Sequence, residues 1–322
     1  MPKASRVNTP PAGPLGSGAG VRTRGHARPS APVPGCWTTA SLARVARAPG
    51  TIAAVPEPVV ITDPDDPRVA DFRDLKAGDR PADVPRGTGT VIVEGTAAIE
   101  RLLLSPYRVR AVFGVPGRVE ALGVPGDVAV YVADKWVVSE VIGFRLTRGA
   151  LASADRLPPA DLGRLLGGPD PAAPRRLAVL EALNDHENLG SIARSAVALG
   201  IDGLLLDPRC ADPLYRRSVR VSMGHVLTLP FAVLPEWPGA LEQVHDAGYL
   251  TVALTPADDA VDLTGVDPRE HPRTAVLLGA EGPGLTPEAQ RAARVRARIP
   301  MRSGVDSLGV AAAAAIAFAS LR

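Results

Sequence analysis

The chain has 322 residues, 46% of them hydrophobic, and a formal net charge of +2 at pH 7. This length predicts two domains and a tail, since a domain typically has roughly 100–200 residues. The two cysteines, Cys36 and Cys210, are far apart, which argues against a disulfide framework and a cysteine zinc site. No apolar run reaches the ~18 residues of a membrane span.

The charge is distributed unevenly along the chain. Residues 1–50 contain seven Lys and Arg and no Asp or Glu, so the remaining residues carry a net charge of −5. The folded part is therefore not globally basic, and a nucleic acid would have to bind it at local arginine patches.

Residues 1–50 are rich in Pro, Gly, Ala and Arg and have no apolar period. This composition predicts a disordered basic tail, because it offers too little apolar surface to fold. An Arg-rich, acid-poor segment is also typical of an organelle transit peptide, and a misassigned start upstream is a further alternative.

Residues 51–150 are predicted to form a small α/β domain. A β-rich run, Thr90–Val93, is followed by Thr96 as the cap of a helix over Ala97–Leu104. Val109–Phe113 and Val128–Val132 are further short strands, each followed by a helix-like stretch, and this alternation indicates an α/β layer domain.

Residues 151–175 contain Pro158-Pro159 and Gly167-Gly168-Pro169, which predict a linker with one short helix.

Residues 176–322 alternate apolar runs of strand length with helical patterns. Strands are predicted at Leu177–Leu183, Gly203–Leu206, Val226–Phe231, Leu250–Leu254, Ala275–Gly279 and Val295–Ile299. Helices are predicted at Asn188–Leu199, Asp212–Met223, near Ala240–Ala247, after Thr286-Pro287-Glu288 and at Ser307–Leu321. Apolar strands that alternate with helices indicate a parallel sheet covered on both faces.

Three segments of this domain lie where strands lead into helices, the usual ligand edge of a parallel sheet. They are Asn184-Asp-His-Glu-Asn188-Leu-Gly190-Ser-Ile-Ala-Arg194, Leu277-Leu-Gly279-Ala-Glu281-Gly282-Pro-Gly284-Leu285 and Ile299-Pro300-Met301-Arg302-Ser-Gly-Val-Asp306-Ser307-Leu308-Gly309-Val310-Ala311. The glycines of the second have the reverse spacing of the dinucleotide fingerprint, and no Gly-Lys-Ser/Thr follows, which excludes a P-loop. Each segment alone is also compatible with a glycine turn or a helix cap, and His186 with a surface loop.

Together, in this order and spacing, the segments resemble the three signature motifs of the SpoU (TrmH-like) branch of the knotted SPOUT methyltransferases. The triplet Ser222-Met223-Gly224 adds to the resemblance, which covers essentially all of residues 176–322. Residues 88–150 resemble the small ribosomal-protein-like RNA-binding domain that often precedes this domain. The resemblance implies a trefoil knot, a homodimer with shared active sites, and S-adenosylmethionine-dependent methylation of a ribose 2′-hydroxyl in rRNA or tRNA.

The resemblance also assigns roles to residues of this chain. Arg194 would act across the dimer interface, Asn188 and Glu281 would fix the loop and orient Arg194 or the nucleotide, and Ser307 matches the serine of the third motif. The cofactor would lie among Leu278, Gly279, Ala280, Gly282, Gly284, Ile299, Met301 and Leu308. Since arginine stays protonated, with a pKa above ~12, we expect Arg194 to grip the adjacent phosphate and stabilise the developing alkoxide. The general base is left open.

Five arginines are candidates for RNA phosphate contacts near the site: Arg175, Arg176, Arg216, Arg217 and Arg220. The alternative for each is a solvated helix face. No cluster of Cys, His and carboxylates has metal-ligand spacing, so we expect no metal and no membrane partner, and a cytoplasmic location.

One position departs from the family pattern. Gly309 stands where the family usually has Asn, and glycine lacks the amide donor and acceptor. This difference is compatible with weak activity, with altered substrate positioning, or with compensation by a neighbour such as Asp306. It is also compatible with an inactive RNA-binding relative. An unrelated nucleotide-binding α/β enzyme is a third hypothesis.

Overall fold

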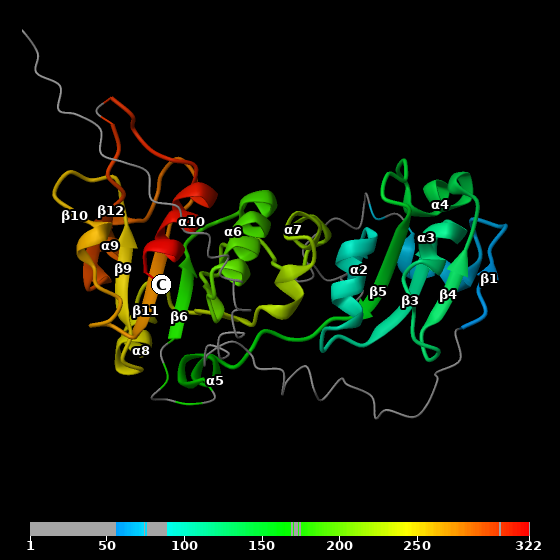
Figure 1. The fold of residues 1–322 in the computed structure, drawn as a ribbon, viewed down its shortest axis with the longest axis horizontal. Helices are drawn as coiled ribbons and strands as arrows, with labels where there is room; N and C mark the ends of the chain where they lie inside the picture. Colours follow the sequence, from blue (N-terminus) through cyan, green and yellow to red (C-terminus); the bar gives the residue numbers. More distant parts are fainter. Residues whose placement is uncertain are drawn as a thin grey trace, which may run out of the picture. The chain divides into compact units, whose positions relative to one another are not determined.

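The computed structural model describes residues 56–73, 75, 89–168, 170, 173, 175–302 and 304–321. All of them belong to one unit of contacting elements, in which two β-sheets are each covered by helices (Figure 1). The predicted tail of residues 1–50 lies outside the described residues.

The first sheet has the strand order β1-β4-β3-β5-β2. Its strands are β1 (Val59–Val60), β2 (Thr90–Glu94), β3 (Val109–Gly114), β4 (Ala129–Val132) and β5 (Ala150–Asp155). β1 and β3 pair parallel with β4, whereas β5 pairs antiparallel with β3 and β2. β5 thus extends into residues 151–175, predicted as a linker. Three of its six residues are Ala, which has weak strand propensity, and pairing on both sides decides its conformation.

Helices cover both faces of this sheet. α2 (Thr96–Leu103) and α3 (Pro116–Glu120) pack on one face through Ile99, Leu102 and Val119. The 3-10 helix η1 (Pro67–Phe72) and α4 (Lys135–Ile142) pack on the other. The cap of α2 is Gly95, with φ 96°, and not Thr96 as predicted, because the turn after β2 needs a left-handed residue.

The second sheet consists of seven strands in the order β10-β12-β9-β11-β6-β7-β8, and every pair is parallel. The strands are β6 (Arg175–Leu180), β7 (Gly203–Leu206), β8 (Phe231–Val233), β9 (Leu250–Leu254), β10 (Val261–Asp262), β11 (Arg273–Leu278) and β12 (Val295–Arg298). The predicted parallel sheet is confirmed.

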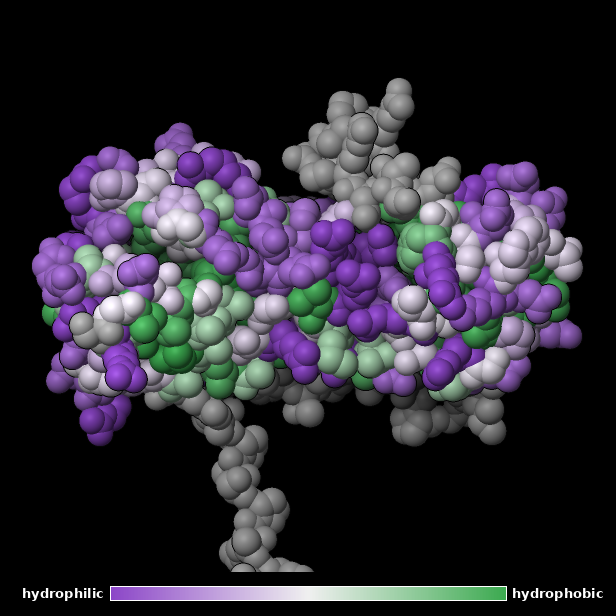
Figure 2. All heavy atoms as spheres, turned by 90° about the horizontal axis from the view of Figure 1, so that it is seen from above, coloured by the Kyte–Doolittle hydropathy of each residue, from purple (hydrophilic) through white to green (hydrophobic). Residues whose placement is uncertain are grey.

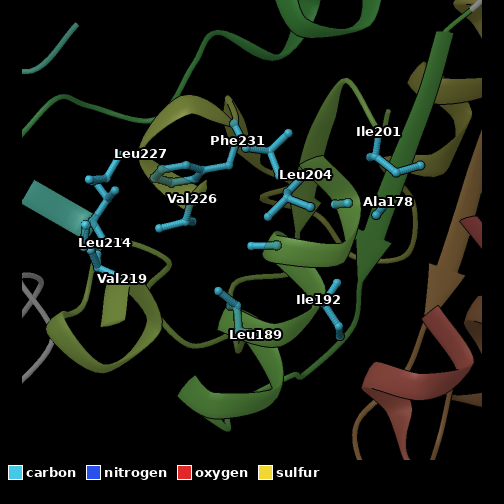
Figure 3. Close-up of a cluster of buried hydrophobic side chains, with 14 of the residues drawn as sticks. Ala178, Leu189, Ile192, Ile201, Leu204, Leu214, Val219, Val226, Leu227 and Phe231 are labelled. Carbon is cyan, nitrogen blue, oxygen red and sulfur yellow. The ribbon is translucent and has the colours of Figure 1, made fainter. Parts of the chain in front are cut away.

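Side chains alternate across the two faces of this sheet. Ala178 and Leu180 of β6 face α6 (His186–Ala198) and α10 (Val310–Ser320), whereas Leu177 and Val179 belong to the core on the opposite face. That second core includes α5 (Leu162–Gly167), α8 (Leu241–Asp246) and α9 (Pro287–Ala292). Figure 3 shows the first core continuing from α6 towards α7 (Arg216–Val221).

Several predicted elements differ from the structure. The strand predicted at Val226–Phe231 is the 3-10 helix η2 (His225–Thr228) followed by β8, since a short apolar run fits either element. The predicted helix Asp212–Met223 forms only over α7. The helix predicted at Ser307–Leu321 begins at Val310.

The helix predicted from Asn188 begins earlier, at His186, because Asp185 caps it. His186 is therefore a helix residue and not part of a surface loop, and its ring lies 4.1 Å from that of Tyr215. A last 3-10 turn, η3, spans Leu263–Gly265.

Hydrophilic and hydrophobic side chains are interspersed on the face shown in Figure 2. Several large apolar side chains are exposed, among them Val305, Leu308 and Ile316 near the carboxyl end of the chain. Among the described residues, no helix combines the length and apolar character needed to cross a membrane.

Candidate functional site

The carboxyl ends of the parallel strands bring the three sequence motifs to one edge of the second sheet. β6 and β11 are neighbours, and β9 lies between β11 and β12. The loops that follow β6, β11 and β12 therefore start within roughly 15 Å of one another at the usual strand spacing. Residues 181–185, 279–286 and 299–309 form these loops. The sheet thus brings together motifs that are distant in the sequence, such as those of Asn188 and Glu281, which are 93 positions apart.

The first and second motifs are joined by a side-chain hydrogen bond. Asp185 caps α6 by accepting hydrogen bonds from the amides of Glu187, at 2.6 Å, and Asn188, at 2.8 Å. The Asn188 Nδ2 donates to Glu281 Oε2 at 2.8 Å. Two of the four predicted catalytic residues are therefore in contact, and the bond fixes the glycine loop against the start of α6.

The glycine loop is a tight turn that only glycine permits. A Cβ at Gly279 would lie 2.1 Å from the carbonyl carbon of Gly284. The amide of Gly284 donates to the carbonyl of Ala280 at 3.0 Å, and Gly282 and Gly284 have φ of 90° and 70°. The loop thus exposes backbone at the sheet edge.

A buried carboxylate anchors the far end of this loop. Glu181, 1% exposed, accepts hydrogen bonds from the amide and hydroxyl of Thr286, at 2.8 and 2.7 Å, and from Trp237 Nε1 at 2.6 Å. Arg209 pairs with it at 3.3 Å. Sequence reasoning missed Glu181, although an acid within an apolar strand is a signal of a buried partner.

The third motif follows β12 as an exposed loop. Ile299 and Met301 are half-buried, whereas Ser307 and Leu308 are exposed, the latter by 37%. Gly309 is the N-cap residue of α10 and makes no side-chain cap. This loop adds exposed apolar surface to the same sheet edge as the exposed glycine backbone, and such a combination is suited to a bound organic group.

Arg194 lies on α6 on a different side from Asn188, and its side chain is exposed. Beside it, α6 and α7 approach closely, because a Cβ at Gly190 would lie 2.7 Å from the carbonyl oxygen of Ser218. Among the described residues, Arg194 has no hydrogen bond or ion pair. It forms neither a hydrogen bond nor an ion pair with Glu281 or Ser307 of the same chain.

The charge of Arg194 acts on His225. Burial first, and then the charges of Arg101 and Arg194, hold the pKa of His225 below its ordinary value of 6.5. The imidazole is therefore neutral at pH 7.

Comparison with known proteins identifies the family. A model of the SpoU rRNA methylase family matches residues 175–319. An uncharacterized tRNA/rRNA methyltransferase of Mycobacterium tuberculosis is 46% identical over 264 residues, which cover 80% of this chain and 89% of that protein. This chain belongs to the SpoU rRNA methylase family. The resemblance seen in the sequence is confirmed, and an unrelated nucleotide-binding enzyme is excluded.

Solved structures show the same fold as this SpoU-family chain. An rRNA methyltransferase from Sinorhizobium meliloti is 25% identical with a TM-score of 0.67, covering 82% of this chain and 97% of that one. The SpoU methyltransferase AviRb from Streptomyces viridochromogenes, in complex with the cofactor AdoMet, is 24% identical with a TM-score of 0.65; 78% of this chain and 97% of that one are covered.

The five arginines proposed for RNA have different environments in this SpoU-family chain. Arg175 and Arg176 begin β6, so they lie at the opposite end of the strand from the motif loops, which argues against an RNA contact near the site. Arg216 Nη1 binds Glu94 Oε2 at 3.0 Å and its guanidinium lies 4.7 Å from the centre of the Phe144 ring. Arg220 reaches the same carboxylate at 3.8 Å.

Arg217 is the exposed member of this set and has no ion pair among the described residues. Of the α7 arginines it is therefore the one whose charge is available to a phosphate without breaking a contact. Arg216 and Arg220 would have to leave Glu94, which is 1% exposed.

Neither of two cavities is lined by the predicted cofactor residues. One, of about 230 Å³, is lined by Gly95, Arg118, Arg148 and Met223 among others, and the other, of about 370 Å³, adjoins Glu181 and Trp237. In the part of the chain that the structure describes, no three His, Cys, Asp or Glu side chains converge as metal ligands.

Proposed function

We propose that this chain is an S-adenosylmethionine-dependent RNA ribose 2′-O-methyltransferase acting on rRNA or tRNA. The observation that carries the proposal is the hydrogen bond from Asn188 to Glu281, which joins two family motifs at the carboxyl edge of the sheet. Family membership and the name of the mycobacterial relative, tRNA/rRNA methyltransferase, support RNA as the substrate.

The predicted cofactor residues fit the proposed group. Nothing lies within 4 Å of where a Cβ would stand at Gly282 or Gly284, so a ligand can approach the backbone there. Leu308 offers exposed apolar surface, and Leu278 is buried beneath the loop. When bound, S-adenosylmethionine supplies a methyl group on a positively charged sulfur. Ala280, Gly279, Ile299 and Met301 complete the proposed site, and transfer should be unaffected by a chelator.

We propose that Arg194 binds the RNA that accepts the methyl group. Its exposed guanidinium can bind the phosphate beside the target ribose and stabilise negative charge as the 2′-oxygen loses its proton. It stays protonated and therefore does not remove that proton itself. Asn188 and Glu281 hold the glycine loop, and Ser307 lies on the opposing loop, where its hydroxyl can orient the nucleotide.

We also propose that the active site is shared between two subunits of a homodimer and that the methyltransferase domain is knotted. The isolated position of Arg194 supports this, because the chain itself brings no other motif residue to it. α10 also presents Ile316, 40% exposed, on its outer side. Light scattering at micromolar concentration should give a dimer mass, and a clean monomer would contradict the shared site.

The alternative is an inactive RNA-binding relative, and Gly309 is the observation that favours it. The residue has φ −56° and caps α10 without a side-chain hydrogen bond. The chain thus folds without the Asn side chain that the family usually has there, so this side chain is not required for the fold.

The deciding experiment measures methyl transfer. The full chain is incubated with radiolabelled S-adenosylmethionine and ribosomal or transfer RNA that lacks the modification. The product is hydrolysed with alkali, which cannot cleave beside a 2′-O-methylated ribose. We expect label in alkali-resistant dinucleotides; label in mononucleotides would indicate base methylation, and no transfer to any RNA would favour the inactive relative.

A further inference from the structure

The cavity of about 230 Å³ lies outside the predicted active site. We call it the arginine cavity. Its wall is formed by residues 94–98 at the end of β2 and the first turn of α2, Arg118 of α3, Thr147 and Arg148 before β5, and Met223. The first domain thus supplies most of the wall and the methyltransferase domain supplies Met223.

Two arginine side chains are held at this cavity by glycines. A Cβ at Gly149 would lie 2.6 Å from Cγ of Arg118, and one at Gly95 would lie 3.1 Å from Cδ of Arg148. Both glycines have left-handed φ, 82° and 96°. The aliphatic stems therefore pack against bare backbone, which restricts where the charged ends can lie.

The two guanidinium groups are not neutralised by the protein. In the described residues neither Arg118 nor Arg148 has an ion pair or hydrogen-bond partner, and both are exposed. Glu94 also lines the cavity, but its carboxylate is 1% exposed and pairs with Arg216 and Arg220. The cavity therefore carries an excess of positive charge that a ligand can meet.

Arg101 adds a further positive charge next to the cavity. Arg101 Nη1 donates to the carbonyl oxygen of Met223 at 2.9 Å, and Met223 lines the cavity. His225 follows two residues later and feels the charges of both Arg101 and Arg194. Met223 has φ 53°, an unusual conformation that is retained where Arg101 holds its carbonyl.

We propose that the arginine cavity binds a backbone phosphate of the substrate RNA, on the strand that flanks the target nucleotide. The inference rests on the proposed function. Paired guanidinium groups suit phosphate oxygens, which they bind bidentately. The cavity of about 230 Å³ is large enough for a phosphate group. A contact to backbone phosphate positions RNA without selecting its sequence.

The test compares full-length variants in RNA binding and turnover. The probes are a fluorescein-labelled mixed-sequence RNA hairpin and the ribosomal RNA that the wild type methylates. Arg118→Ala with Arg148→Ala should weaken binding about tenfold at moderate salt and reduce the slope of log K against log salt by about 1–2. KM for the RNA should rise while kcat stays within twofold, because neither residue touches the reacting atoms.

Two controls separate phosphate binding from loss of fold or of general charge. Arg164→Ala removes another exposed arginine without an ion pair, on α5, and should leave the salt slope unchanged. The pair Arg118→Lys and Arg148→Lys keeps the stems on the glycines and should retain most of the slope. Calorimetry should show unchanged S-adenosylmethionine binding in every variant.

Each outcome decides between the two proposals. If the wild type methylates RNA and the double alanine variant has an unchanged slope and KM, the phosphate site is wrong and the proposed function stands. Binding of poly-glutamate is measured as a third probe. If the double variant loses binding to poly-glutamate but keeps binding to RNA, the cavity binds an acidic protein and the phosphate site is wrong. If the wild type neither binds nor methylates any RNA, both proposals are overturned.

Discussion

The arginines of α7 and those of the arginine cavity have the same charge but different surroundings. Arg216 and Arg220 of α7 share the buried Glu94, whereas Arg118 and Arg148 of the first domain rest on glycines and meet no carboxylate among the described residues. A dense arginine pattern in the sequence therefore does not identify an RNA-binding surface, because availability depends on which acids the fold brings near.

The largest expected effect concerns an arginine without a partner. Arg194→Ala should lower kcat by about 10²–10³-fold, the scale for losing one donor that acts in the transition state. S-adenosylmethionine binding, measured by calorimetry, should be nearly unchanged, because the proposed cofactor loops do not include Arg194. Equal transfer by the variant and the wild type would remove Arg194 from the mechanism.

The next effect contrasts two neighbours on α7. Arg216→Ala should lower the free energy of unfolding by about 2–4 kcal/mol, since it leaves the buried carboxylate of Glu94 with only the more distant Arg220. Arg217→Ala should change it by less than about 0.5 kcal/mol. Urea denaturation of both variants measures the difference, and equal stability would show that the Glu94 pair contributes nothing net.

A smaller effect is expected at the cap of α10. Gly309→Asn meets no atom within 4 Å of the new Cβ and keeps an ordinary φ of −56°. An Asn side chain can accept a hydrogen bond from the first turn, so the variant should be more stable by a few tenths of a kcal/mol. Methyl transfer tells whether the lost Asn matters: a higher rate would show that it does, and an unchanged or lower rate would show compensation by neighbours.

The smallest effect is a dependence of stability on pH. The folded pKa of His225 lies below its ordinary 6.5, so below that pH the unfolded chain binds more protons and stability falls as pH falls. His225→Gln should therefore reduce the loss of stability between pH 7 and pH 5. The matched comparison is a His245→Gln variant, because the pKa of His245 is also lowered, by burial and then by Arg294. An unchanged pH profile in the His225 variant would contradict the buried, cationic environment.

The sequence by itself predicted the parallel sheet of the second domain and the location of the three motifs where its strands lead into helices. Apolar runs such as Leu204–Leu206 and Ala275–Leu278 alternate with helical patterns, and this alternation indicates buried parallel strands. The strand ends then place Asn188 and Glu281 at one sheet edge. The glycine-rich sequence at 279–284 indicated a tight turn, and the structure shows that a side chain at Gly279 would clash with the backbone of Gly284.

Only the tertiary structure decided the rest. The Ala-rich strand β5 and the 3-10 turn at 225–228 have ambiguous local propensities, so long-range pairing and packing fixed them. The ion pair of Glu94 with Arg216 joins residues that are 122 positions apart. Glu181 accepts hydrogen bonds from side chains or amides of three separate loops. Side-chain pairing of charges is a property of proximity in space, and proximity between distant segments is set by the whole fold.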